Sequence, residues 1–200
     1  MSEQKVRCNW GSAYPEELIY HDTEWGTPCF DDRVQFEFLV LESAQAGLSW
    51  RTVLLKRQGY RELFAGFDPV QVAEFGPKEM EKLLLDPRIL RNRKKIEAAI
   101  GNARCFLEVQ ARYGSFCNYL WDFVDGRPLL NHWKDVAEIP AQTALSDKIA
   151  KDMKQKGFRF LGSIVIYSHL QATGLVNDHT TDCFRHAECQ KIFLNRAGVK

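Results

Sequence analysis

Cysteine and histidine residues near the two ends of this 200-residue chain have the spacing of metal-ligand pairs. Cys8 and His21 form the first pair, and His179 and Cys183 form the second. Two thiolates and two imidazoles make a closed tetrahedral ligand set of the kind that suits structural zinc. His179 and Cys183 lie four positions apart, a spacing that places both side chains on one side of a helical turn. A shared metal ion would therefore fasten the two ends of the chain together.

The spacing alone leaves other assignments open. The sequence contains six cysteines and five histidines, so pairs of this form also arise by chance. His186 and Cys189 make a competing pair near the same end of the chain. The zinc hypothesis therefore needs support beyond this spacing.

Length and composition bound the class of protein. Two hundred residues with 45% apolar content can bury one substantial core, or one core with a smaller lobe. The net charge of +1 excludes a broadly basic surface, so any nucleic-acid contact must come from a local basic patch. The cysteines form no regular disulfide framework, the N-terminal segment does not resemble a signal peptide, and no apolar run approaches the roughly 18 residues of a membrane span. These features predict a cytoplasmic protein with reduced cysteines and no membrane segment.

Helical periodicity runs along the whole chain and predicts an all-α fold in a single unit over residues 1–200. Asp32 and Gln35 give a capping-box signal for a largely buried helix that ends at Gly47, and Ser49 can cap the next one. Further helices are expected after Asp68, from Pro77, around Ile96–Leu107 up to Gly114, over 115–124, over 143–156, and in a last strong helix up to Gly174. No convincing pair of alternating strands is found.

Glu42 is the first of three local features that could carry chemistry. It lies one turn beyond Phe38, at the edge of the inward stripe of the buried helix, where a carboxylate is costly unless it is paired or lines a cleft. An ion pair with an arginine is the alternative. Gln45 falls near the middle of the same stripe, so two polar groups face where apolar ones are expected. The presence of both Glu42 and Gln45 on this stripe favours a pocket that they line.

The second feature is a group of aromatic residues in the N-terminal quarter of the chain. The group consists of Trp10, Tyr14, Tyr20, Trp25 and Trp50. Flat rings around a polar group can hold an extruded nucleobase by stacking on its faces. Aromatic residues more often form plain core, and that interpretation also stays open.

The third feature is a basic segment with five cations in the eight residues from Arg88 to Lys95. It lies between two expected helices, at the start of the longer one. The free N–H groups and positive dipole of a helix N-terminus attract anions, and arginines beside it suit a phosphate. A solvated charged face is the alternative.

Four blocks of the sequence also carry a resemblance to a known family. They are Tyr20-His21-Asp22-x-Glu24-Trp25-Gly26, Leu41-Glu42-x3-Ala46-Gly47-Leu48-Ser49-Trp50, Ile96-x3-Ile100-x-Asn102-Ala103 and Gly174-Leu175-Val176-Asn177-Asp178-His179. In order, over roughly residues 7–183, the chain resembles the 3-methyladenine-DNA glycosylase I family. The resemblance implies a helix-hairpin-helix DNA glycosylase with an all-α fold. Such an enzyme flips 3-methyladenine out of alkylated double-stranded DNA and hydrolyses its N-glycosidic bond, leaving an abasic site for base excision repair.

The resemblance also implies roles for individual residues. Glu42 matches the carboxylate that reads the base, Tyr20 and Trp50 match the stacking aromatics, and Trp10 is expected to close the pocket. Leu48 matches the position that approaches the gap left by the flipped base, although it could instead staple onto Val53. The ligands of the family's structural zinc, which joins the N- and C-terminal segments, fall on Cys8, His21, His179 and Cys183. His186 and Cys189 are then bystanders.

The helix-hairpin-helix element is expected near 77–113, with its hairpin over Asp86–Lys95. Its DNA-backbone contacts would be Arg88, Arg91, Arg93 and Lys94. This hairpin lacks the glycine-rich turn that general helix-hairpin-helix motifs use to bring backbone N–H groups to a phosphate. Ser43 and His169 stand where a glycine and a hydrophobic residue are expected, and His169 could alter substrate fit if it reaches the pocket.

The expected chemistry follows from the leaving group. Methylation at N3 makes adenine cationic, so the glycosidic bond is already weakened. Glu42 would favour the positive charge of the base, and the rings of Trp50 and Tyr20 would add cation–π attraction. The chain is expected to act as a monomer without a redox cofactor. The alternative function is a non-catalytic, zinc-stabilised module that binds DNA or modified bases, and Glu42 on a pocket-facing helix favours the enzyme.

Overall fold

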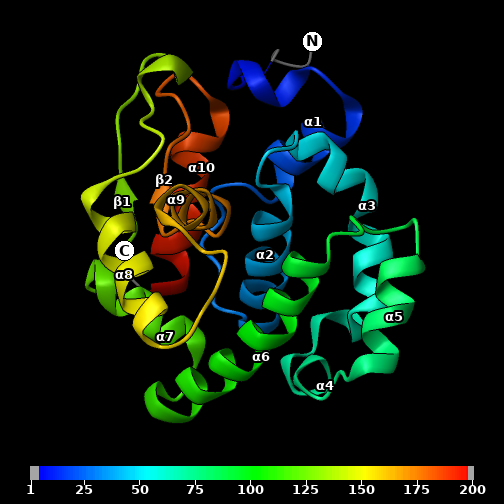
Figure 1. The fold of residues 1–200 in the computed structure, drawn as a ribbon. Helices are drawn as coiled ribbons and strands as arrows, with labels where there is room; N and C mark the ends of the chain where they lie inside the picture. The colour runs from blue at the N-terminus through cyan, green and yellow to red at the C-terminus, as the bar shows by residue number, and fades with distance from the viewer. Residues whose placement is uncertain (1–4, 198–200) are drawn as a thin grey trace.

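The chain folds into a helical protein, for which a computed structural model describes residues 5–197 (Figure 1). The helices are α1 (Pro15–Thr23), α2 (Asp32–Gln45), α3 (Trp50–Leu63), α4 (Pro69–Ala73), α5 (Pro77–Leu85), α6 (Arg93–Tyr113), α7 (Phe116–Trp121), α8 (Ala144–Gln155), α9 (Ser163–Ala172) and α10 (Phe184–Ala197). Short 3₁₀ turns cover Asn9–Ser12, Ala65–Phe67, Asp122–Val124 and Val136–Glu138. The prediction of a predominantly helical class is confirmed. None of the helices in the described part is long and apolar enough to cross a membrane.

Helix α2 is the central element of the core. Figure 1 shows it between α3 on one side and α9 on the other, and it also packs against α6 and α7. Phe36, Leu39 and Leu41 are almost completely buried on different faces of this helix. A helix that is apolar on all sides is stable only when other elements surround it. The position of α2 therefore explains why a carboxylate near its end needs a special environment.

The predicted caps are mostly confirmed, with one shift. Ser49 and Asp68 accept hydrogen bonds from the first-turn N–H groups of α3 and α4, and Thr143, for which no cap was predicted, does the same for α8. The expectation that Asp32 caps α2 is wrong, because Asp31 accepts from the N–H groups of residues 33 and 34 instead. The Asp32 carboxylate crosses to α7, where it accepts from the backbone N–H groups of residues 116 and 117.

The helix at each end of the chain was not expected from the sequence. Helix α1 begins with Pro15 in its first turn but has no side-chain cap, which removed the usual sequence signal. The helix predicted to end near Gly174 is confirmed as α9, but the expectation that it is the last strong helix is wrong, because α10 follows. Its Phe193 ring stacks on Trp121 at 6.0 Å between centroids. Residues 184–197 therefore help to cover the core.

Two further expectations need correction. A short parallel pair of strands, β1 (Leu129–Leu130) and β2 (Val176–Asn177), is present where no strand pair was expected. Two residues per strand are too few to show an alternating pattern. The segment from His179 to Cys183 is not helical; it is a turn closed by Cys183 N–H donating to Thr180 O, and α10 starts at the next residue.

The two ends of the described chain lie side by side. Phe184 N–H donates to Val6 O at 3.0 Å, and Figure 1 shows the N-terminal segment beside the start of α10. This contact brings the two predicted metal-ligand pairs to the same place.

Two pairs of consecutive helices form hairpins. Residues 86–92 join α5 to α6, and residues 156–162 join α8 to α9. The second connection has Gly157 at φ +92° as its second residue and ends with Gly162, which precedes α9 without a side-chain cap. The second connection therefore contains two glycines, whereas the first contains none.

Candidate functional site

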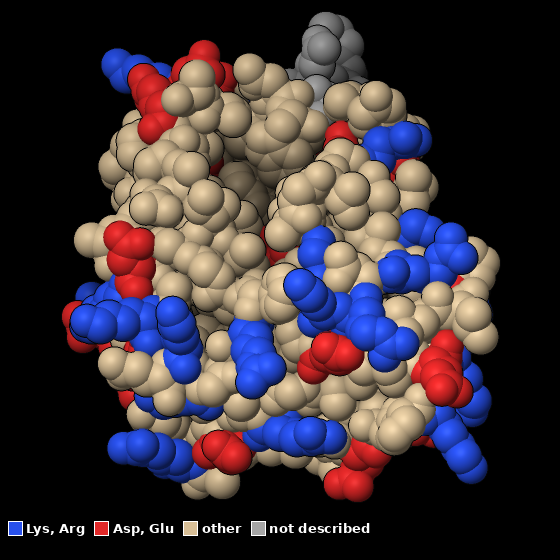
Figure 2. Space-filling model, viewed as in Figure 1, with Lys and Arg blue, Asp and Glu red and all other residues tan. Residues whose placement is uncertain are grey.

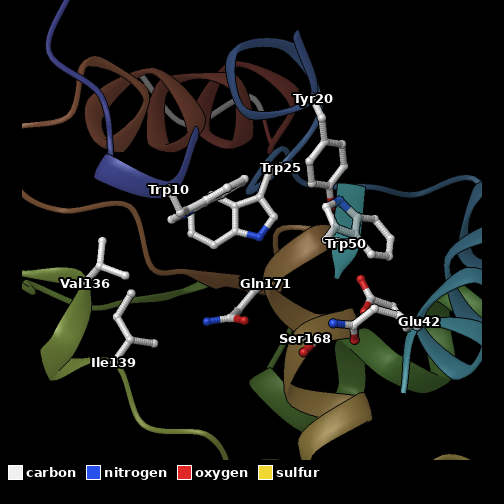
Figure 3. Close-up of a pocket in the computed structure, with 10 residues that line it drawn as sticks. Trp10, Tyr20, Trp25, Glu42, Trp50, Val136, Ile139, Ser168 and Gln171 are labelled. Carbon is white, nitrogen blue, oxygen red and sulfur yellow. The ribbon is translucent and has the colours of Figure 1, made fainter. Parts of the chain in front are cut away.

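A pocket of about 320 Å³ lies between α2, α9 and the N-terminal segment. It is visible as a hollow in the upper half of the face in Figure 2, and Figure 3 shows its walls. Ten residues line it: Trp10, Tyr20, Trp25, Glu42, Gln45, Trp50, Val136, Ile139, Ser168 and Gln171. Its volume falls in the range of small-molecule sites, and its lining is mostly aromatic and apolar with a few polar groups.

The aromatic wall of the pocket confirms that most of the predicted group converges. Tyr20 lies with its ring centroid 5.3 Å from that of Trp50 and 6.3 Å from that of Trp10. Trp10 meets Trp25 edge-on at 4.9 Å. Tyr14 does not join them; it is exposed, and the Arg51 guanidinium covers its ring at 4.2 Å. Four of the five aromatic residues therefore surround one cavity.

Glu42 contributes the one acidic side chain of the pocket wall, and it is only 4% exposed. Within residues 5–197 its carboxylate has no hydrogen-bond or ion-pair partner, so the predicted alternative of an arginine partner is wrong. Glu37, earlier on the same helix, shows the contrast, because its carboxylate accepts from Arg57 at 2.6 Å and from Arg61 at 2.9 Å. Burial without a compensating charge raises the pKa of Glu42 from 4.5 to about 8.

Two polar groups beside Glu42 also have no hydrogen-bond partner among residues 5–197. The indole Nε1 of Trp50 is buried, and no described residue accepts its hydrogen. The Tyr20 ring is 3% exposed, and burial together with the nearby Glu42 carboxylate raises the pKa of its hydroxyl. Unpaired buried polar groups are costly, so their concentration in one cavity indicates a site built for a polar, flat ligand.

The four predicted metal ligands meet in one buried cluster. The ligand atoms of Cys8, His21, His179 and Cys183 all lie within 4.8 Å of one another. Cys183 Sγ is 3.5 Å from both His21 Nε2 and His179 Nδ1, and Cys8 Sγ is 3.6 Å from His179 Nδ1. Tetrahedral bonds of about 2.0–2.3 Å place neighbouring ligand atoms roughly 3.3–3.8 Å apart. The three printed separations fit such a site, so the cluster could bind a metal ion.

The second ring nitrogen of each histidine in the cluster is also held. His21 Nδ1 lies 2.9 Å from Asp22 Oδ1, and His179 Nε2 lies 3.0 Å from the backbone oxygen of Trp25. Such contacts fix the tautomer and ring orientation of metal-binding histidines. Gly26 permits the close approach, since its φ is +76° and a Cβ there would lie 2.7 Å from His179 Nε2. His186 instead contacts Asn131 O at 2.9 Å, and it lies outside the cluster together with Cys189.

The Cys/His cluster and the pocket share a wall. The Trp25 ring meets the His179 ring edge-on at 4.5 Å, and the Trp10 ring meets His21 edge-on at 5.3 Å. Both tryptophans line the pocket on their other side. The cluster therefore braces the aromatic wall in addition to joining the two ends of the chain.

A buried carboxylate positions the opposite wall. Asp178 accepts hydrogen bonds from Asn131 and Trp133 through Oδ1, and from Tyr167 and Gln171 through Oδ2. Because the Gln171 amide nitrogen is used in this way, its oxygen is the end that remains free to face the pocket (Figure 3). The residues from α9 and 136–139 were missed by the sequence analysis, since polar positions on a short helix give no signal of their direction.

Three further residues singled out in the sequence, Leu48, Ser43 and His169, are not among those that line the pocket. Leu48 is 43% exposed in the turn between α2 and α3, so the predicted staple onto Val53 does not bury it. His169 is fully buried, contacts Gln35 Oε1 at 2.7 Å, and does not line the pocket. Ser43 is also buried, with an unpartnered hydroxyl.

The basic segment lies on the same face as the pocket. Lys and Arg side chains gather below and to the right of the hollow, over the start of α6 (Figure 2). Arg88 is engaged by Glu62 and Asp86, and Arg93 lies 3.8 Å from Glu97. Arg91 and Lys94 are exposed and have no partner within the described residues.

Comparison with known proteins agrees with this geometry. Residues 10–186 match the methyladenine glycosylase family. DNA-3-methyladenine glycosylase 1 of Escherichia coli is 45% identical over 177 residues, which cover 88% of this chain and 95% of that protein. The chain thus belongs to the methyladenine glycosylase family.

Solved structures of similar proteins have the same fold. A crystal structure of 3-methyladenine DNA glycosylase I superposes with a TM-score of 0.87 at 46% identity, covering 90% of this chain and 98% of that one. A structure of 3-methyladenine DNA glycosylase I from Staphylococcus aureus, which concerns recognition of 3-methyladenine, superposes with a TM-score of 0.86 at 38% identity. It covers 89% of this chain and 95% of that one.

The raised pKa of Glu42 makes a prediction about stability. Between 4.5 and about 8 the folded protein keeps a proton that the unfolded chain has lost, so Glu42 makes stability fall as pH rises through this window. Glu42→Gln cannot ionise. It should therefore gain free energy of unfolding relative to wild type between pH 5 and pH 8, on the order of a few kcal/mol at most because water reaches the pocket. Urea unfolding of both proteins at these pH values measures the difference, with the exposed Glu108→Gln as control. Parallel pH profiles for wild type and Glu42→Gln would contradict the assignment.

Proposed function

We propose that this protein is a DNA repair glycosylase that captures 3-methyladenine swung out of alkylated DNA and hydrolyses its N-glycosidic bond, leaving an abasic site. The single observation that carries this proposal is the unpaired Glu42 carboxylate beside the Tyr20 and Trp50 rings. Family membership supports it, since the E. coli relative is a DNA-3-methyladenine glycosylase.

The pocket suits a cation that is flat and carries an amino group. Methylation at N3 gives adenine a positive charge, and a carboxylate that lacks a protein counter-ion gains most from such a ligand. The rings of Tyr20 and Trp50 stack on the base and add a cation–π attraction that neutral adenine does not provide. Glu42 accepts a hydrogen bond from the amino group of the base. When the glycosidic bond breaks, the base takes the bonding electrons and leaves as a neutral molecule.

This arrangement lowers the barrier by holding the leaving group instead of protonating it. The positive charge of the base already weakens the glycosidic bond, so the pocket must only bind the base and stabilise it until water attacks the sugar. Glu42 is therefore the proposed catalytic residue, with Trp10 closing the pocket over the base.

Replacement of Glu42 tests the proposal against the alternative of a module that binds without cleaving. Release of 3-methyladenine from methylated duplex DNA should be readily measured for wild type and should fall about 10- to 150-fold in Glu42→Gln, because a hydrogen bond to a charged group is lost. Glu108→Gln, on the exposed face of α6, is the control and should keep wild-type activity. Methylated DNA that is bound by wild type without any release of base would establish the binding module instead.

We also propose that the cluster of Cys8, His21, His179 and Cys183 is a structural zinc site. Two cysteine and two histidine ligands leave no open position for water, so a zinc ion held there would brace the fold and take no part in the chemistry. The buried Cys8 thiol and the fixed histidine tautomers support this assignment. Because Trp10 and Trp25 pack on the ligand rings, loss of the ion should also loosen the pocket wall.

Metal analysis and ligand replacement test the zinc site. About one zinc per chain is expected, and Cys183→Ala should lose it and lower the melting temperature by on the order of 10 °C, corresponding to several kcal/mol. Cys189→Ala is the matched control, since Cys189 is buried near the same helix but outside the cluster. Equal metal content in the two variants, or none in wild type, would reject the site.

The proposed partner is double-stranded DNA bound by a single protein chain across the face in Figure 2. Arg91 and Lys94 are free to contact phosphates, whereas Arg88 and Arg93 would first have to leave their carboxylates. In this proposal two hairpins bind the DNA backbone: the hairpin of α5 and α6, for which the helix-hairpin-helix role was predicted, and the hairpin of α8 and α9. The uncapped N–H groups at the start of α9 can bind a phosphate, and the same helix supplies Ser168 and Gln171 to the pocket.

A further inference from the structure

Lys95 lies in the first turn of α6, and its ammonium group reaches the end of α2. Its Nζ donates to Ala44 O at 2.9 Å and to Ala46 O at 2.8 Å. The last carbonyl groups of a helix lack partners within the helix, and an ammonium group there also interacts favourably with the helix dipole. Lys95 therefore ties the basic segment at the start of α6 to the last turn of the helix that carries Glu42.

The turn that follows α2 carries Leu48 at its exposed tip. Gly47 adopts φ +84°, Leu48 N–H donates to Gln45 O at 2.7 Å, and Gln45 Nε2 donates to Leu48 O at 3.1 Å. The turn is thus built on the end of α2 and leads directly into α3, which begins with Trp50. Any shift of the α2 end moves Leu48 together with the rim of the pocket.

The neighbouring lysine provides a comparison within the same helical turn. Lys94 is exposed and has no partner in the described part of the chain, whereas Lys95 is partly buried by the contacts just described. Burial lowers the pKa of Lys95, in keeping with an ammonium group committed to the protein interior. Lys94 and Lys95 carry the same charge, but only Lys95 donates hydrogen bonds to the end of α2.

We propose that Lys95 is a positioning residue that holds the Leu48 turn where Leu48 can fill the gap left in DNA by the flipped base. The inference rests on the proposed function and adds a physical link between the segment that faces phosphates and the residue that enters the duplex. Lys95 itself does not touch the base; it acts through the two carbonyl groups that end α2.

A double-mutant cycle on excision of 3-methyladenine from duplex DNA tests this link. In the wild-type background Leu48→Ala should reduce the excision rate about tenfold, and in the Lys95→Met background about twofold or less, because the turn is already displaced. In the Lys94→Met background the effect of Leu48→Ala should remain about tenfold, since that lysine makes no contact with the turn. Equal effects of Leu48→Ala in the two lysine backgrounds would overturn the proposal.

Two further readouts separate positioning from general damage or loss of charge. Lys94→Met should lower the salt slope of DNA binding by about one, as for a phosphate contact, while Lys95→Met should leave the affinity for free 3-methyladenine within about twofold of wild type. Loss of free-base binding in Lys95→Met would assign it a merely structural role. A wild-type protein that releases no base would refute the proposed function. In that case the same double-mutant cycle would be measured as the affinity for DNA containing an abasic-site analogue. Additive effects of Leu48→Ala and Lys95→Met on this affinity would again contradict the proposed role of Lys95.

Discussion

The structure depends on one constraint, a carboxylate held in an aromatic cavity without a counter-ion. Other helices surround α2, and Glu37 on this helix is paired with two arginines, yet Glu42 has no partner in the described part of the chain and lies against a wall of rings. Such a group destabilises the fold whenever it ionises. The cost is offset when a positively charged ligand enters, so the same interaction that weakens the empty protein selects a cationic base.

The aromatic wall needs support of its own, because Trp10 packs on a smaller hydrophobic cluster and not on the main core. That support is the cluster of two cysteines and two histidines, whose rings pack directly on Trp10 and Trp25. The opposite wall is held by Asp178, which directs the Gln171 amide. The ligand pair His179 and Cys183 follows Asp178 in one short turn, so this segment positions both walls.

The sequence predicted those features that depend on local chemistry and failed where direction depended on packing. Caps such as Ser49 and Asp68 were predictable, because the side chain and the N–H groups that it receives are close in the chain. It was not predictable that Asp31 would cap α2 in place of Asp32. The Asp32 carboxylate accepts from backbone N–H groups at the start of α7, more than 80 residues away. Glu42 could be predicted from its position at the edge of the inward stripe of α2, whereas the direction of Gln171 depends on the buried Asp178 that orients it. The meeting of two cysteines and two histidines could be predicted from residue types and from family resemblance, but the packing of His179 against Trp25 depends on the tertiary fold.

The most direct test of the central claim is the titration of the Glu42 side-chain carboxyl, followed by carbon NMR with and without 3-methyladenine. An unpaired carboxylate in the aromatic cavity should titrate with a pKa near 8, well above the ordinary 4.5, in the free protein. Bound base should lower that pKa, because the complex favours the ionised form. A carboxyl that titrates near its ordinary value and does not respond to 3-methyladenine would contradict the account.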